Sequence, residues 1–223
     1  LRTALPSAAP PARLSGLPPP VSRYHRLAVG DARAVATLRM RHGGTFCTSP
    51  AARPVPIRGE QICTADPPGF LWRGQVRIAP GAWIDARDFS MAGKGSMRVL
   101  LNDTLTIADA HGPEVDQGSA LRLLAEMPWY PTVLFDARYV SWSAIGAEHA
   151  RATLRLGNLE VSGVFEFGGD GLPVRMTAER FMDKAGLRPW SGVYRSFRTV
   201  RGLRVPFEAE VTWQLESGPF TYA

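Results

Sequence analysis

The sequence predicts a mainly β protein of the α+β class, with a single curved antiparallel sheet or open half-barrel and helices on its concave face. Three observations predict it. Apolar and polar residues alternate along several short segments, glycine-containing turns separate these segments, and only two segments show helical periodicity. Because successive side chains of a strand point to opposite faces, the alternation indicates strands with one buried and one solvent-facing side.

The first 20 residues differ in composition from the rest of the 223-residue chain. They contain six prolines among small residues, a composition that favours extended backbone and buries little surface. We therefore expect a Pro-rich linker over residues 1–20 and one β-rich domain over residues 21–223. The chain begins at Leu1 without an initiator Met, so we also expect that an N-terminal targeting or anchoring segment has been lost.

Two helices are expected, near residues 21–29 and 116–127. In the first, Val21, Tyr24 and Ala28 recur at helical spacing before Gly30 ends the pattern. In the second, Asp116 is the expected N-cap and Pro128 ends the run. Its apolar stripe consists of Ala120, Leu123, Leu124 and Met127.

The expected strands follow these helices and each other along the chain. Segments 150–156 and 159–167 alternate clearly, and Gly157 and Asn158 between them are typical of a tight hairpin. Segments 70–78, 97–101 and 172–178 show shorter alternation. The longest apolar alternation is that of Val205, Phe207, Ala209, Val211, Trp213 and Leu215. This phase predicts that Trp213 is buried on the concave face, with Glu210 and Gln214 exposed.

Composition narrows the range of partners. Lys and Arg number 26 against 20 Asp and Glu, a net charge of +6, and arginines predominate. They are scattered rather than gathered in a basic run, so we expect no nucleic-acid partner. No apolar stretch approaches the roughly 18 residues that a membrane-spanning helix needs.

Motifs of the common enzyme classes are absent from the sequence, and we expect no cofactor. The four histidines lack a second ligand at a spacing typical of zinc, so no metal site is expected either. Cys47 and Cys63 are the only cysteines. A disulfide between them stays open, but if residues 42–47 and 58–63 pair as neighbouring strands, simple register holds the two sulfurs apart and favours free thiols.

Acid and base groups could still form an active site without a motif. Glu126 follows Arg122 by four residues, so it is either an exposed ion pair or a buried acid next to Trp129. Glu114 lies near the N-terminus of the second helix, where it would stabilise the helix dipole. His111 could join these carboxylates as a base.

Large aromatic side chains are the more unusual feature of the sequence. Six tryptophans are present, and Trp72 and Trp213 alternate in phase with the apolar faces of their strands. Core packing explains such residues, but a single sheet with one main helix is thin and can leave an apolar pocket. The residues expected to line that pocket are Phe70, Trp72, Trp129, Phe165, Met176 and Trp213.

Several segments carry a family resemblance. They are QICTADPPGFLW at 61–72, GPEVDQGSALRLLAEMPWYPTVL at 112–134, ARATL at 150–154, and VYRSFR, GLRVPFEAEVTW and GPFTY within 193–222. Through them the chain resembles a family of uncharacterised bacterial proteins, a domain of unknown function often found behind an N-terminal hydrophobic segment. Two departures are Cys47, where the family usually has a polar or basic residue, and the end of the chain just after GPFTY.

The order of strands and helices is also similar to that of the lipoprotein-carrier half-barrels of the bacterial envelope, which wrap a helix and hold acyl chains. This resemblance implies a periplasmic or membrane-anchored location, with any membrane association made through a segment absent from this chain. Three functions follow from the sequence. The first is a non-enzymatic envelope protein that binds an apolar small molecule or a lipid acyl chain; the others are an enzyme using Glu126, Glu114 or His111, and a structural or scaffolding module.

Overall fold

The first half of the chain folds into a helix and a six-stranded sheet. A computed structural model describes residues 16–183 and 186–223. Helix α1 (Pro19–Ala28) is followed by an antiparallel meander, which we call sheet A, in the order β1-β2-β3-β4-β5-β6. Its strands are β1 (Thr37–Phe46), β2 (Val55–Ala65), β3 (Pro68–Ala79), β4 (Ala82–Met91), β5 (Lys94–Leu101) and β6 (Leu105–Ala110).

The second half supplies the central helix and another sheet. After β6 come α2 (Pro113–Glu126) and two 3-10 turns, η1 (Met127–Trp129) and η2 (Pro131–Phe135). The seven-stranded sheet B has the order β15-β14-β11-β10-β9-β8-β7. Its strands are β7 (Val140–Ala144), β8 (His149–Leu156), β9 (Leu159–Phe167), β10 (Pro173–Asp183), β11 (Gly186–Arg195), β14 (Glu208–Leu215) and β15 (Gly218–Thr221), while β12 (Arg198–Val200) and β13 (Leu203–Val205) form a separate ribbon.

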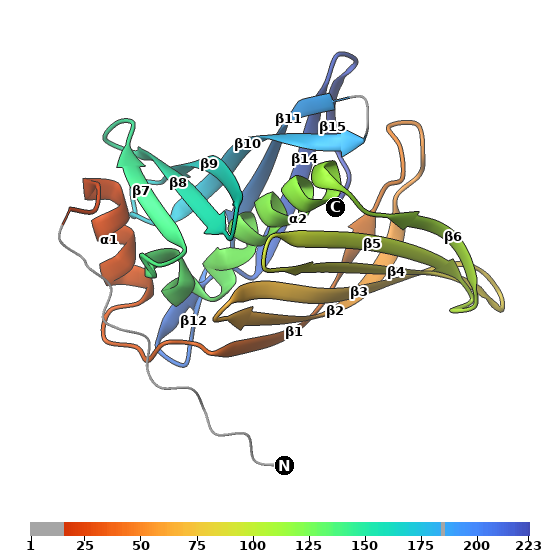
Figure 1. The fold of residues 1–223 in the computed structure, drawn as a ribbon, viewed down its shortest axis with the longest axis horizontal. Coiled ribbons are helices and arrows are strands. Elements are labelled where there is room, and N and C mark those ends of the chain that lie inside the picture. Colours follow the sequence, from red (N-terminus) through yellow and green to blue (C-terminus); the bar gives the residue numbers. More distant parts are fainter. Residues whose placement is uncertain (1–15, 184–185) are drawn as a thin grey trace, which may run out of the picture.

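The mainly β, antiparallel fold with two helices is as predicted, but the prediction of one sheet is wrong. Strands β6 and β7 are edge strands of different sheets, and α2 and the two 3-10 turns lie between them in the chain. Figure 1 shows α2 lying between the two sheets. Alternation in a sequence shows which face of a strand is buried but not which strands pair, so it could not separate one sheet from two.

Both helices are found, with shifted starts. Helix α1 begins at Pro19, two residues before the predicted start, because proline fits the first turn of a helix, where its missing N–H is not needed. Residues 1–15 of the predicted linker lie outside the described residues. Helix α2 begins at Pro113 with Gly112 as its N-cap, so Asp116 is inside the helix. The Asp116 carboxylate instead accepts hydrogen bonds from the Gly95 N–H (2.7 Å) and Lys94 Nζ (2.9 Å) of sheet A.

The strand phase is confirmed around Trp213 and wrong farther upstream. Trp213 is buried and Gln214 is exposed, whereas Glu210 is half-buried. Phe207, predicted to face inward, is exposed. The predicted long strand is divided in two at Pro206, which has no N–H to donate to a neighbouring strand. The hairpin at residues 157–158 is present, with Leu156 opposite Leu159 and Gly157 at φ +61°.

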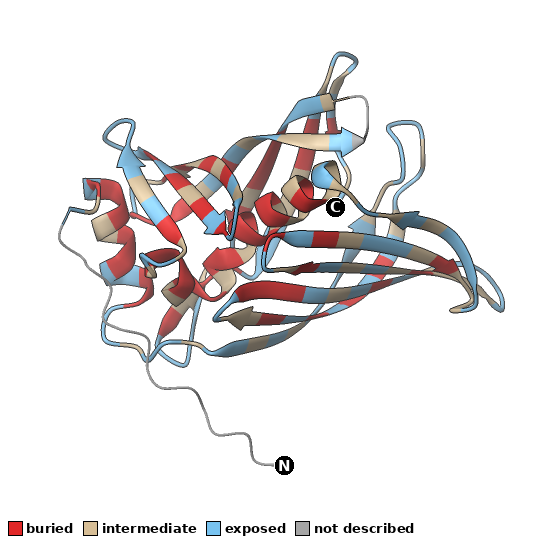
Figure 2. Cartoon of the chain, in the orientation of Figure 1, coloured by how far each residue is buried: buried red, intermediate tan, exposed pale blue. Residues whose placement is uncertain are grey.

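Buried side chains concentrate around α2 and the facing sides of the sheets, as Figure 2 shows. Helix α2 is bound to sheet B through Gln117. β9 pairs with β10 only as far as Thr177, and beyond that point Gln117 Nε2 donates to the Glu179 carbonyl (2.8 Å) while the Phe181 N–H donates to Gln117 Oε1 (3.2 Å). A side-chain amide of α2 thus takes the place of a strand partner.

Candidate functional site

A cluster of charged and amide groups lies where the C-terminal half of α2 crosses sheet A. We call it the Arg122 cluster: Gln61, Asp88, Arg122 and Glu126. Arg122 donates from Nη1 to Asp88, from Nε to Glu126 Oε1 (2.7 Å) and from Nη2 to Gln61 Oε1 (3.1 Å). Gln61 Nε2 donates to Glu126 Oε2 (2.5 Å), which closes a ring of contacts. Buried ions need such pairing to be tolerated, although Asp88 Oδ1 has no hydrogen-bond partner among the described residues.

The local fold explains why these four groups meet. Gln61 on β2 and Asp88 on β4 lie opposite Trp72 on β3, so all three side chains leave the sheet on the same face. Arg122 and Glu126 are four residues apart on α2 and therefore share one side of the helix. The sequence left open an exposed ion pair or a buried acid next to Trp129; Glu126 does pair with Arg122, but the pair is largely buried.

Burial controls the electrostatics of this cluster. It raises the pKa of Asp88 above its usual range, an effect that the positive charge of Arg122 opposes. Burial opposes the charge of Arg122 as well, but the carboxylates of Glu126 and Asp88 outweigh it and raise the pKa of Arg122. The side chains of Arg122, Asp88 and Glu126 keep exposures of 18, 21 and 13%. The cluster is therefore accessible from solvent on one side.

Trp72 and His42 form a flat aromatic pair on the same face of sheet A. Trp72 Nε1 donates to His42 Nε2 (2.7 Å), and the two rings are within 12° of parallel. The acceptor role of Nε2 makes His42 neutral, and burial together with the nearby Arg122 lowers the pKa of His42. The Arg122 guanidinium lies 4.8 Å from the centre of the Trp72 ring, within cation–π range.

Two glycines make room for this aromatic pair. A Cβ on Gly74 would lie 2.1 Å from Trp72 Cη2, and a Cβ on Gly59 would lie 2.2 Å from His42 Nε2. The rings therefore lie flat against the sheet backbone. Neither glycine has a positive φ, so close approach of the rings is what requires glycine at these positions.

Beyond α2, the same face of sheet A carries apolar side chains that are only half-buried. The strand register places them on the face of Trp72, with Val76 opposite Ile84 and Ile84 opposite Leu101. These half-buried residues are Val76, Ile84, Val99 and Leu101. We call this region, together with Trp72, the inner apolar surface.

The two cysteines are both free thiols. Cys63 is buried and its Sγ accepts a hydrogen bond from Gln61 Nε2 (3.2 Å). Burial raises the pKa of the Cys63 thiol to about 12, which keeps it protonated and unreactive at neutral pH. Cys63 lies opposite Leu38 rather than His42, so the register assumed from sequence was wrong although the separation of the sulfurs is correct.

The six side chains predicted to line an apolar pocket are divided between two environments. Phe70, Phe165, Met176 and Trp213 are buried in the core, whereas Trp72 and Trp129 are half-buried at its margin. A shallow hollow of about 630 Å³ on sheet B is lined by other residues, among them Arg151, Glu160 and Arg175. That the six predicted residues contact a ligand stays a prediction.

The three residues of the predicted enzyme are not brought together. Glu126 belongs to the Arg122 cluster, whereas Glu114 lies twelve residues earlier on the same helix, about 18 Å away along its axis. His111 is exposed and pairs through Nε2 with Asp109 Oδ1 (2.6 Å) at the end of β6. The positions that sequence reasoning missed, Gln61 and Asp88, carry one signal: each is a polar residue in phase with the inward-facing side of its strand.

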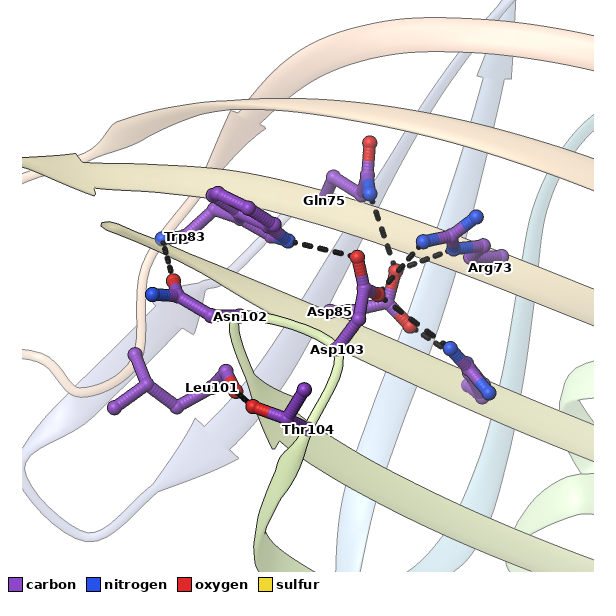
Figure 3. A network of polar contacts seen from close by, with 9 residues as sticks. Arg73, Gln75, Trp83, Asp85, Leu101, Asn102, Asp103 and Thr104 are labelled. Atoms are coloured by element: carbon purple, nitrogen blue, oxygen red, sulfur yellow. Dashed lines mark hydrogen bonds and ion pairs between the residues drawn. The ribbon is translucent and has the colours of Figure 1, made fainter. Parts of the chain in front are cut away.

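A second polar network covers the opposite, outer face of sheet A (Figure 3). Its centre is Asp85, whose side chain has no exposed surface and accepts hydrogen bonds from Arg73, Arg87 and Gln75. Burial alone would raise the pKa of Asp85, but the hydrogen bonds from Arg73 and Arg87 outweigh it and lower that pKa. With every partner provided by the sheet itself, this network stabilises β3 and β4.

The described residues hold neither a cluster of metal-binding side chains nor a membrane-spanning helix. In residues 16–183 and 186–223, no group of three or more His, Cys, Asp or Glu side chains is placed to hold a metal ion. Within the same residues, no helix is long and apolar enough to span a bilayer.

Comparison with known families is consistent with the resemblance seen in the sequence. The model of a family of unknown function, DUF6544, matches residues 7–223. The chain belongs to this family. No curated protein and no solved structure shows significant similarity to the chain. Function must therefore be argued from the geometry of the site.

Proposed function

We propose that the protein is a non-enzymatic binding protein for an apolar ligand such as a lipid acyl chain, held in a half-barrel formed by the two sheets around α2. The inner apolar surface is the observation that carries this proposal. Half-buried Val, Ile and Leu side chains on the inward-facing side of a strand are unusual, because that face is normally covered completely. A bound chain would cover them.

The edges of the two sheets support the half-barrel. The Cys47 N–H, directly after β1, donates to the Tyr222 carbonyl after β15 (2.8 Å), and the Phe46 and Tyr222 rings meet edge to face. The free edge of sheet A and the free edge of sheet B are therefore joined at one point. On this proposal the sheets and α2 enclose a trough whose floor is the inner apolar surface.

The Arg122 cluster forms the inner end of that trough. Its ions pair with one another, and within the cluster Asp88 Oδ1 alone lacks a hydrogen-bond partner among the described residues. Because Arg122 is paired with both carboxylates, we take the cluster to favour binding over catalysis. The location in the bacterial envelope, and membrane association through a segment outside this chain, belong to the same proposal and rest on the resemblance alone.

Binding of a fluorescent fatty-acid analogue, measured by titration, tests the proposal. The variant Val76→Glu puts a charge on the inner apolar surface and should weaken binding at least about tenfold, roughly 1.4 kcal/mol. Leu71→Glu is the matched control, because Leu71 lies on the same strand but is exposed on the outer face. Absence of binding by the wild-type protein, or equal binding by Val76→Glu and wild type, would refute the proposal.

A further inference from the structure

Arg180 is a partly buried cation whose described partners are all neutral. Its Nε donates to the Gly118 carbonyl of α2 (3.0 Å), and its Nη1 donates to the Tyr222 hydroxyl (3.3 Å). Among the side chains that the structure describes, which do not include that of Asp183, no carboxylate lies within 4 Å of it. Arg188, another cation, lies directly opposite Arg180 on β11 and therefore on the same face. Like charges at such a position repel each other, although solvent screens the exposed Arg188.

Aromatic rings fix the guanidinium of Arg180 in place. It lies 5.3 Å from the Trp190 ring centre and 5.4 Å from that of Trp213. The Tyr222 hydroxyl accepts from both Arg180 Nη1 and Trp190 Nε1 (3.1 Å), which uses both of its lone pairs. Its own proton is therefore free to donate. Arg180 and Tyr222 together present donors without an acceptor, beside the rings of Trp190 and Trp213. We call these four side chains the Arg180 frame.

The Arg122 cluster, on sheet A and α2, lies close to the Arg180 frame of sheet B. Asp88 Oδ1 is buried without a hydrogen-bond partner, and the charge of Arg180 is close enough to lower the pKa of Asp88 against the larger effect of burial. Arg122 is paired with Asp88 and Glu126, whereas Arg180 has no carboxylate partner among the described side chains. A single monoanion would therefore neutralise Arg180.

We propose that Arg180 and Tyr222 bind the carboxylate of a fatty-acid-like amphiphile, whose chain lies along the inner apolar surface. This inference rests on the proposed function and adds the chemical class of the ligand. A carboxylate suits the donors because it accepts from a guanidinium and a hydroxyl together through charge-assisted hydrogen bonds. The aromatic rings exclude water from these bonds and so strengthen them.

The experiment compares palmitic acid with hexadecanol, which has the same chain without the charge, by displacement of a fluorescent acyl probe. Wild type should bind the acid at least tenfold more tightly than the alcohol. Arg180→Met keeps the stacking stem but removes the charge, and it should abolish that preference while alcohol binding, which also reports a folded protein, persists. Arg175→Met is the matched control, because Arg175 is exposed on the same strand at a position of opposite phase.

The outcomes separate the two proposals. If wild type binds neither compound, the proposed function fails and this inference fails with it. If it binds both equally, the carboxylate site is wrong and the apolar site stands. An acid preference that survives in both Arg180→Met and Tyr222→Phe would place the carboxylate elsewhere, and displacement of the probe by acetate at comparable concentrations would mean a free-anion site instead of an amphiphile site.

Discussion

Replacing Gly74 by alanine should displace the Trp72 ring from its contact with His42 rather than distort the strand backbone. A Cβ at this position would lie 2.1 Å from Trp72 Cη2 and 2.4 Å from Cζ2, far inside van der Waals contact. The indole has no room to shift toward the sheet, so it must lift away from it. That movement breaks the Trp72–His42 hydrogen bond and the stacking of Arg122 on the ring.

The magnitude follows from overpacking. Forcing an extra methyl into a filled site costs about 1–3 kcal/mol, and the lost hydrogen bond adds about 1 kcal/mol. We expect Gly74→Ala to lower the free energy of unfolding by about 2–4 kcal/mol, measured by urea denaturation followed by circular dichroism. In the Trp72→Ala background the same change should cost much less, because the clashing ring is gone. The resulting coupling should exceed about 1 kcal/mol.

Gly44 provides the control for this prediction. It lies on β1 on the same face of sheet A, has no positive φ, and has open space where a Cβ would be. Gly44→Ala should be neutral or stabilise the protein by a few tenths of a kcal/mol, since alanine restricts the unfolded chain. If Gly74→Ala behaves like Gly44→Ala, within about 0.5 kcal/mol, the reasoning about the flat aromatic pair is wrong.

Two further predictions concern buried side chains on either side of the molecule. Trp213→Ala removes a buried indole from sheet B and should cost about 3–5 kcal/mol in urea denaturation; a loss below about 2 kcal/mol would mean that its surroundings are not filled. Asp85→Asn removes a carboxylate whose pKa is lowered in the folded state, so at neutral pH it should cost about 1–3 kcal/mol. Because Asp85 stabilises the fold above its unfolded pKa near 3.8, and this stabilisation is lost as the pH falls through its lower folded pKa, the difference between variant and wild type should shrink below pH 3.8. A difference independent of pH from 7 to 2 would contradict this assignment.

Local patterns in the sequence predicted local structure well. The stripe of Ala120, Leu123 and Leu124 identified α2, and the Gly157–Asn158 turn identified the β8–β9 hairpin, since both signals lie within a few residues. The number of sheets was not predictable in this way. It depends on which strands pair across the β6–α2–β7 connection, and no period within a strand carries that information.

The candidate site was harder still, because its members are distant in sequence. Trp72 was found through its strand phase, and Glu126 through its spacing from Arg122. Asp88 and Gln61 were not among the predicted site residues. Burial of a polar residue on the inward-facing side of a strand nevertheless costs free energy unless the residue has a hydrogen-bond partner. Searching the conditional strand 58–63 for such residues would have found Gln61, whereas Asp88 lies on β4, for which no strand was predicted.

Helix α2 links the two halves of the proposed binding site. It is bound to sheet A through Asp116, Arg122 and Glu126, and to sheet B through Gln117 and the Gly118 carbonyl that Arg180 contacts. The inner apolar surface and the Arg180 frame thus come from segments about a hundred residues apart, and α2 holds both. A ligand that spans them would contact both sheets, so its binding should stabilise the whole fold rather than one sheet, by RT ln(1 + [L]/Kd). Stabilisation confined to one sheet, seen as hydrogen-exchange protection on that sheet alone, would be inconsistent with a ligand lying between them.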